Sequence, residues 1–119
     1  MNTPANRGRI LFADDELQVR TTIARMLQAH GFACTCVASG DEVLAQLGQH
    51  EFDALISDLR MPGNDGLSLI ENVTQRAAGL PVVLLTGAPT VETAARSLRL
   101  PVVAYLMKPA DCDELVLIL

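Results

Sequence analysis

Short apolar segments alternate with longer amphipathic segments from one end of the chain to the other. Residues 9–13, 54–57 and 81–85 are apolar without polar alternation, which is typical of strands that are covered on both faces. Two further apolar runs of similar length complete the set. The five predicted strands are residues 9–13, 32–37, 54–57, 81–85 and 102–107.

Each predicted strand is followed by a segment with helical periodicity. Val19, Ile23 and Leu27 recur every four residues within 16–30, and Gly31 is suited to end that helix. The remaining predicted helices begin near residues 39, 67, 90 and 111, and the stretches 39–42 and 111–114 carry a capping-box pattern.

Five strand–helix units without a linker, repeat or low-complexity segment predict one α/β domain. Right-handed crossovers place a helix over each pair of strands, so we expect a doubly wound parallel sheet with helices on both faces. We expect residues 1–8 to form a flexible N-terminal tail and residues 9–119 to form the domain. The last helix has no cap before Leu119, which suggests that the sequence was cut from a longer protein.

Composition narrows the classes of partner. Among 119 residues, 9 basic and 14 acidic side chains give a formal charge of −5, which argues against duplex DNA and anionic membranes as partners. The chain has no Trp and a single Tyr, so platforms for base stacking are not expected.

The chain has only three cysteines, whereas a secreted disulfide framework has a larger and even number. Cys34 and Cys36 share one face of a predicted strand, and we interpret them as small core residues, because a metal site would need more Cys or His nearby. His30 and His50 each follow a predicted helix, where they suit the helix dipole. No leader-like or membrane-spanning apolar run is present in this sequence, and we expect a cytoplasmic protein.

Polar residues stand at the carboxyl ends of the predicted strands, where open parallel sheets bind ligands. Asp14 and Asp15 follow the first strand, and Asp58 follows the third. Thr86 follows the fourth strand and Lys108 the fifth. We therefore expect these side chains to gather at one edge of the sheet.

Three clustered carboxylates repel one another, since two unit charges about 4 Å apart interact by roughly 4 kcal/mol near a protein surface. A cation relieves that repulsion, and oxygen ligands without Cys or His favour Mg²⁺ over zinc. Lys108 and Thr86 supply a charge and a hydroxyl for phosphoryl oxygens, and an Asp carboxylate is a competent nucleophile toward phosphorus. The predicted chemistry is Mg²⁺-assisted transfer of a phosphoryl group to a carboxylate.

At these residues the chain resembles the receiver domains of two-component response regulators, including the single-domain chemotaxis regulator. The resemblance covers nearly the whole chain, and its four motifs occur in order at the ends of the expected strands. They are residues 13–16 (ADDE), 58–66 (DLRMPGNDG), 85–87 (LTG) and 105–109 (YLMKP). The resemblance implies a flavodoxin-like strand order 2-1-3-4-5.

The resemblance also implies a role for each site residue. Asp58 would accept the phosphoryl group from a sensor histidine kinase or a phosphotransfer protein, with Lys108 and Thr86 contacting its oxygens. Asp15, Asp58 and the main-chain carbonyl of Arg60 would ligate Mg²⁺, and Asp14 would hold a metal-bound water. The domain would be a signalling phosphoprotein that catalyses its own phosphorylation and dephosphorylation, not an enzyme acting on a separate substrate.

The family's switch and its output surface are implied in the same way. Thr86 would move toward the phosphoryl group and Tyr105 would rotate inward behind it. Lys108 and Pro109 would be joined by a cis peptide bond. The fourth helix, fifth strand and fifth helix would then form the output face and the site of a phosphorylation-dependent dimer.

Taken singly, each motif has an ordinary structural explanation. Asp14 or Asp15 alone suits a helix N-cap, and residues 62–66 alone suit a turn. Thr86 can simply end a strand, and Tyr105 is suited to packing at a half-buried position. Their joint placement at successive strand ends is what favours the functional interpretation.

Two features depart from the family pattern or vary within it. Pro101–Val102 replaces a usual Gly–Ala pair and Ala104 a usual Asp or Gly, which leaves the partner of the output face open. Arg60 and Ala88, two positions after Asp58 and Thr86, flank the path of an attacking water, so we expect them to tune the lifetime of the phosphorylated form.

Other functions fit the motifs less well. A haloacid-dehalogenase phosphohydrolase needs an Asp-x-Asp motif after the first strand, where this chain has Asp14–Asp15. A flavodoxin-like FMN binder needs a phosphate loop there, and the acidic residues would repel a phosphate. A pseudo-receiver that only binds partners would lack some of the site groups, all of which are present.

Overall fold

The computed structural model describes residues 7–59, 61, 67–87, 91–97, 100, 102–108 and 112–119. Its helices and strands alternate along the chain, as the apolar pattern predicts. The strands are β1 (Arg9–Ala13), β2 (Ala33–Val37), β3 (Ala54–Asp58), β4 (Val82–Thr86) and β5 (Val102–Met107). The helices are α1 (Leu17–Ala29), α2 (Gly40–Gln49), α3 (Leu67–Arg76), α4 (Val91–Ser97) and α5 (Cys112–Ile118).

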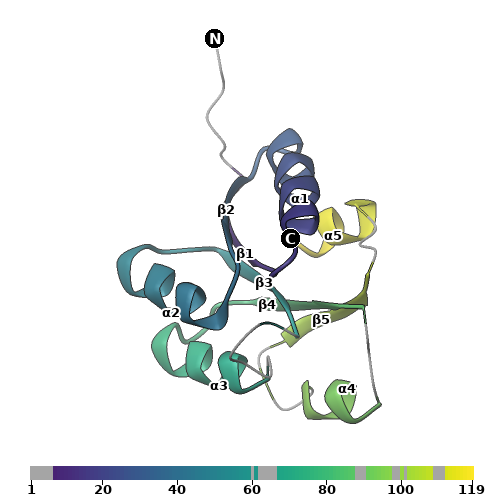
Figure 1. The fold of residues 1–119 in the computed structure, drawn as a ribbon. Coiled ribbons are helices and arrows are strands. Elements are labelled where there is room, and N and C mark those ends of the chain that lie inside the picture. The colour runs from purple at the N-terminus through teal and green to yellow at the C-terminus, as the bar shows by residue number, and fades with distance from the viewer. Residues whose placement is uncertain are drawn as a thin grey trace.

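The five strands form one parallel sheet in the order β2-β1-β3-β4-β5. This order and the helical layers confirm the predicted doubly wound, flavodoxin-like fold. Helices α1 and α5 cover one face of the sheet, and α2, α3 and α4 lie on the other (Figure 1). Because the central strands β1 and β3 are covered on both faces, their apolar side chains are buried without alternation.

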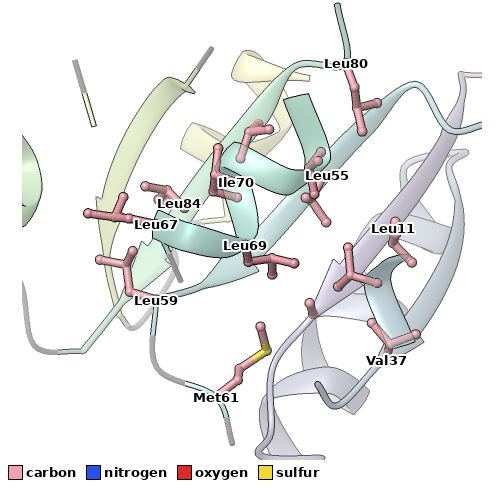
Figure 2. Packing of buried hydrophobic residues seen from close by; sticks show 14 residues of the cluster. Leu11, Val37, Leu55, Leu59, Met61, Leu67, Leu69, Ile70, Leu80 and Leu84 are labelled. Atoms are coloured by element: carbon pink, nitrogen blue, oxygen red, sulfur yellow. The ribbon is translucent and has the colours of Figure 1, made fainter. Parts of the chain in front are cut away.

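Two apolar clusters hold the helices to the sheet. On one face, Leu67, Leu69 and Ile70 of α3 pack over Leu55 and Leu84 of the sheet (Figure 2). On the other face, fully buried side chains of the sheet pack against α1 and α5. The buried members of this second cluster are Ile10, Phe12, Ile23, Leu27, Phe32, Ala54, Ile56, Val83, Leu85 and Leu115.

Local signals end and begin the helices where the sequence predicts. Gly31 has a φ of 89° after α1, a conformation that favours glycine, and His30 caps the helix with its Nδ1 2.9 Å from the Met26 carbonyl oxygen. Ser39 caps α2, where its hydroxyl accepts a hydrogen bond from the Glu42 amide. Thr90 and Asp111, where the last two helices were predicted to begin, lie outside the described residues.

Strand β5 is irregular where the sequence departs from the family pattern. Val82 pairs with Val102 and Val83 with Ala104, so Val103 is an extra residue that forms a β-bulge. Val103 is 58% exposed and Met107 is 63% exposed on this edge strand. Strand β5 therefore presents apolar side chains to solvent near both of its ends, with Met107 at the carboxyl end.

Cys34 and Cys36 lie in β2 and are half-buried against the α1–α5 face of the sheet. They contact the apolar cluster there without being part of its fully buried core. No helix in the described ranges is long and apolar enough to cross a membrane.

Candidate functional site: an acidic pocket at the carboxyl edge of the sheet

The parallel sheet brings the predicted site residues to one edge. Asp14 directly follows β1, Asp58 and Thr86 are the last residues of β3 and β4, and Lys108 directly follows β5. Asp58 pairs with Leu85 and Thr86 with Met107, so the hydrogen-bonded ladder extends through both site residues. Pairing with β4 at Asp58 and with β5 at Thr86 fixes the backbone of each residue on one side.

The ammonium group of Lys108 lies between the carboxylates of the pocket. Nζ of Lys108 lies 2.7 Å from Oδ2 of Asp14 and 3.0 Å from Oδ2 of Asp58. It also lies 3.5 Å from Oε1 of Glu16. The Lys108 amide donates a 2.8 Å hydrogen bond to the Thr86 carbonyl, which anchors the base of this side chain to β4.

Burial makes these charges interact strongly. Asp14 is fully buried, Asp58 is 5% exposed, and the Lys108 side chain is 15% exposed. Burial works to lower the pKa of Lys108, but its interactions with Asp14 and Asp58 outweigh burial and raise the pKa above the ordinary value. Lys108 is therefore fully charged at neutral pH and serves as the counterion of the pocket.

Asp14 is fixed on several sides by backbone and side-chain contacts. Its amide donates to the carbonyl of Val37, and its Oδ1 accepts a 2.9 Å hydrogen bond from the Glu16 amide. Arg20, one turn into α1, donates through Nη1 to the Asp14 carbonyl at 2.8 Å. Glu16 is the N-cap residue of α1 but makes no side-chain cap hydrogen bond, so the carboxylate that accepts an amide before the helix is that of Asp14.

The pocket fits a hard cation. Carboxylate oxygens of Asp14, Asp15 and Glu16 lie within 4.8 Å of one another. Oδ2 of Asp14 is buried and, among the described residues, accepts no well-aligned hydrogen bond, although the Lys108 ammonium is close. A buried oxygen with an available lone pair beside two exposed carboxylates is a suitable set for Mg²⁺.

The two predicted switch residues lie on neighbouring strands. Thr86 is 1% exposed at the end of β4, and Tyr105 of β5 is half-buried against the cluster formed with α2 and α3. Tyr105 pairs with Leu84 in the sheet, two residues before Thr86. Arg60, Ala88 and Pro109 lie outside the described residues, and so does the peptide bond between Lys108 and Pro109.

Two residues at the site, Glu16 and Arg20, have no role that the sequence predicted. Glu16 reaches the Lys108 ammonium, and Arg20 holds the main chain of Asp14. The sequence could have indicated Glu16, because it lies beside Asp14–Asp15 at the carboxyl end of a strand. It offered no such indication for Arg20, which lies one helical turn further along the chain.

A parallel 2-1-3-4-5 sheet with carboxylates and a lysine at its carboxyl edge is the architecture of CheY-like domains. Residues 10–119 match the model of the response regulator receiver domain family, and the chain belongs to that family. Receiver domains act in two-component signalling, are phosphorylated on an aspartate and bind Mg²⁺ at an acidic pocket.

The chain is similar to a part of larger regulators. It is 39% identical over 110 residues to the DNA-binding transcriptional regulator NtrC of Salmonella typhimurium, covering 92% of this chain and 24% of that protein. It is 35% identical to the regulatory protein AtoC of Escherichia coli, again over 24% of that protein. The chain thus spans about a quarter of the length of these curated relatives.

Solved structures show the same fold. A CheY-like receiver domain protein from Methanospirillum hungatei superposes with a TM-score of 0.87 at 27% identity, covering 91% of this chain and 86% of that one. Vibrio cholerae CheY4 superposes with a TM-score of 0.86 at 26% identity, covering 93% of this chain and 94% of that one. A Burkholderia pseudomallei response regulator was solved with a phosphorylated aspartic acid, a calcium ion and citrate. It superposes with a TM-score of 0.85 at 29% identity, covering 91% of this chain and 64% of that one.

Proposed function

We propose that Asp58 accepts a phosphoryl group from a sensor histidine kinase or phosphotransfer protein in a Mg²⁺-dependent reaction. The observation that supports this most directly is the position of Lys108, whose ammonium lies 3.0 Å from Asp58 and 2.7 Å from Asp14. The Burkholderia relative, with its phosphorylated aspartic acid, is consistent with the same chemistry.

The reaction needs a carboxylate nucleophile and a neutralised phosphoryl group. An oxygen of Asp58 forms the new O–P bond, and the P–N bond to the donor imidazole breaks, which leaves the imidazole to take up a proton. Lys108 is positioned to pair with a phosphoryl oxygen, because it already contacts Asp58. Bound Mg²⁺ would supply charge neutralisation at the phosphoryl oxygens.

We propose that Asp14, Asp15, Asp58 and the carbonyl of Arg60 hold the ion, with Asp14 acting through a water. Glu16 adds a further carboxylate beside Asp14 and Asp15. The four carboxylates of residues 14, 15, 16 and 58 against one ammonium sum to −3. A divalent cation therefore reduces the charge of the pocket without reversing it.

Phosphorylation is proposed to switch the output surface through Thr86 and Tyr105. Thr86 is buried beside the site, and its main chain is bonded to Lys108, so a shift of either residue reaches the other. Tyr105 precedes the exposed Met107 on the edge strand β5. We propose that α4, β5 and α5 form the surface that meets an output partner or a second copy.

The lifetime of the phosphorylated form is proposed to depend on Arg60 and Ala88, and a long Arg60 side chain would shield the phosphoryl group from water. We expect Arg60→Ala to change the rate of hydrolysis, measured by the decay of the phosphorylated mass. Equal half-lives for the parent and the variant would remove this role.

Three further statements stay predictions. They are the extent of the domain over residues 9–119, the flexible tail at residues 1–8 and a cytoplasmic location.

The phosphoacceptor is tested by incubating the protein with Mg²⁺ and acetyl phosphate, followed by intact-mass spectrometry. We expect one added phosphoryl group in the parent and none in Asp58→Asn. Asp53→Asn is the matched control, because Asp53 is an exposed carboxylate at the opposite edge of the sheet, and it should be labelled like the parent. Labelling that persists in Asp58→Asn would overturn the assignment.

A further inference from the structure

Two thiols lie in contact on the edge strand β2, outside the acidic pocket. Cys34 and Cys36 project from the same face of this strand, and their Sγ atoms are 3.8 Å apart. Both side chains are half-buried, so packing holds them in place while part of each stays accessible. Sγ of Cys36 also lies 3.8 Å from the carbonyl oxygen of Arg20 in α1. The function proposed for the acidic pocket gives this pair no part.

We propose that Cys36 is a site of reversible modification by low-molecular-weight disulfides, and that its modification loosens the main chain at Asp14. The thiolate sulfur of Cys36 attacks one sulfur of the small disulfide, and a new S–S bond forms as the old one breaks. The departing thiolate takes up the proton that Cys36 gave up, so the exchange is balanced. Neither part of the proposal depends on the function proposed for Asp58.

The contact between the two thiols selects Cys36 as the reactive sulfur. The Cys36 thiol is directed at the Arg20 carbonyl, which leaves the Cys34 thiol to donate to Cys36. This hydrogen bond lowers the pKa of Cys36 to about 7, a shift that burial opposes and the charge of Arg20 aids. The same hydrogen bond raises the pKa of Cys34, which therefore keeps its proton. Exchange is fastest for a thiol whose pKa lies near the ambient pH, so Cys36 is the better nucleophile at neutral pH.

Strand geometry disfavours a bond between the two sulfurs themselves. A strand rises about 3.3 Å per residue, so positions i and i+2 lie roughly 6.6 Å apart at Cα. Disulfides span at most about 6.8 Å and are most often nearer 5.5–6 Å, so an internal bond would bend β2. The strand is held by its register with β1, in which Cys34 pairs with Ile10 and Cys36 with Phe12. We therefore expect the mixed disulfide at Cys36 to persist, without displacement of the small thiol by Cys34.

Two short paths of contacts connect Cys36 to Asp14. Along β2, the next residue is Val37, whose carbonyl accepts a 3.1 Å hydrogen bond from the Asp14 amide. Across to α1, Sγ of Cys36 contacts the carbonyl of Arg20. The Arg20 side chain in turn donates a 2.8 Å hydrogen bond through Nη1 to the Asp14 carbonyl. Both paths thus end on the main chain of Asp14.

A group attached to Cys36 affects both paths. The modified sulfur has no proton to donate to the Arg20 carbonyl, and the added group needs room beside α1, where Cys36 is half-buried. We expect α1 to shift away from β2 and the hydrogen bonds of the Asp14 main chain to weaken. Because Asp14 belongs to the proposed cation site, the state of the thiol would then reach the acidic pocket. Only this last consequence rests on the proposed function.

The modification is tested with oxidised glutathione as the small disulfide, on the 119-residue protein carrying Cys112→Ser. Peptide mass spectrometry should place one glutathione on Cys36, and a thiol reductant should remove it. The rate of modification should rise with pH around an apparent pKa of about 7. Cys34→Ala should slow the reaction at pH 7 by about threefold or more, and Cys34→Ser, which keeps a donor, should slow it less. An adduct on Cys34 in place of Cys36, loss of two hydrogens without an adduct, or no reaction would overturn the site.

The effect on Asp14 is measured by amide hydrogen exchange, followed by NMR, with and without glutathione on Cys36. We expect the Asp14 amide to exchange about tenfold faster or more in the modified protein. The control is the Leu55 amide, which donates to the Pro81 carbonyl near the start of β3, and its exchange should not change. Cys36→Ser treated with the same reagent should exchange at Asp14 as it does untreated. An unchanged rate at Asp14, or equal acceleration at Leu55, would contradict the connection between Cys36 and Asp14.

Discussion

The carboxyl edge of the sheet, where its strands end, and the amino edge, where they begin, carry similar ionisable residues in different environments. At the carboxyl edge, Asp14 and Asp58 are buried and converge on one ammonium, that of Lys108. At the amino edge, charged side chains surround a hollow of about 650 Å³ and remain exposed. The ionisable residues that line this hollow are Arg9, His50, Glu51, Asp53 and Arg76.

The difference lies in what the charges contact. Asp53 accepts a 2.7 Å hydrogen bond from the Arg9 amide, and its own amide donates to the Arg9 carbonyl. The Arg9 guanidinium lies 5.3 Å from the ring centre of Phe52. These contacts fix the start of β1 beside the segment that leads into β3, so the charges at this edge serve the backbone. A hollow lined by charges is thus a weaker sign of chemistry than a few buried charges that share one partner.

The largest expected effect is loss of stability on removing the ammonium of the carboxyl edge. Lys108→Met leaves Asp14 and Asp58 buried without their counterion, and we expect it to cost about 3 kcal/mol of unfolding free energy without Mg²⁺. Added Mg²⁺ should restore part of this loss. Urea denaturation followed by circular dichroism measures the loss and its restoration by Mg²⁺. A loss below about 0.5 kcal/mol would mean that the charges at the carboxyl edge stabilise the fold no more than those at the amino edge.

Cation binding should separate the edges next. Asp14→Asn and Asp15→Asn should each weaken Mg²⁺ binding at least tenfold, about 1.4 kcal/mol, because each removes a negative charge that faces the ion, directly at Asp15 and through a water at Asp14. Isothermal titration calorimetry is suitable, since the chain has no Trp for fluorescence. Asp53→Asn is the control at the amino edge and should leave Mg²⁺ affinity unchanged. Equal weakening in all three variants would point to a general effect of charge.

The pH dependence of the Lys108 interactions gives a smaller but more specific effect. The pKa of Lys108 is raised in the folded protein above its ordinary value of 10.5. Its contribution is therefore complete below about pH 10.5 and declines as pH rises through the higher, folded-state pKa. The stability difference between the parent and Lys108→Met should stay constant from pH 7 to pH 10 and shrink above that. Shrinkage already between pH 7 and 9 would assign the effect to another group.

The smallest effect is expected at the amino edge itself. Arg76→Met should change unfolding free energy by no more than about 0.5 kcal/mol, because Arg76 is exposed at the end of α3. Labelling by acetyl phosphate should stay within twofold of the parent. A larger change in labelling would show that the hollow communicates with the carboxyl edge, and the contrast between the edges would then fail.

The apolar pattern predicted all ten elements, and their exact ends depended on hydrogen bonds that the pattern does not contain. Phe32 was predicted to begin the second strand, but its amide bonds to the Leu27 carbonyl at the end of α1, so β2 begins one residue later. Asp58 and Thr86 were predicted to follow their strands and are instead the last residues of the ladder. A polar residue can therefore be the last residue of a strand when one neighbouring strand continues to pair with it, β4 at Asp58 and β5 at Thr86.

The site was predictable as far as strand ends could indicate it. Asp14, Asp58, Thr86 and Lys108 meet at one edge because a parallel sheet aligns its carboxyl ends. The contact of Glu16 with Lys108 depends on how the chain turns between β1 and α1, which residue order alone does not specify. The proximity of the Cys34 and Cys36 sulfurs likewise depends on rotamers, although their shared strand face was predicted.

The position of Lys108 along the chain has a consequence for folding kinetics. Its contact with Glu16 closes a loop of 92 residues, and that with Asp58 a loop of 50. Contacts between such distant parts of the chain form late, because the intervening strands must first be ordered. Interactions absent from the transition state slow unfolding without speeding folding. We therefore expect the contacts of Lys108, which connect the end of β1 to the end of β5, to slow unfolding and so prolong the lifetime of the folded state.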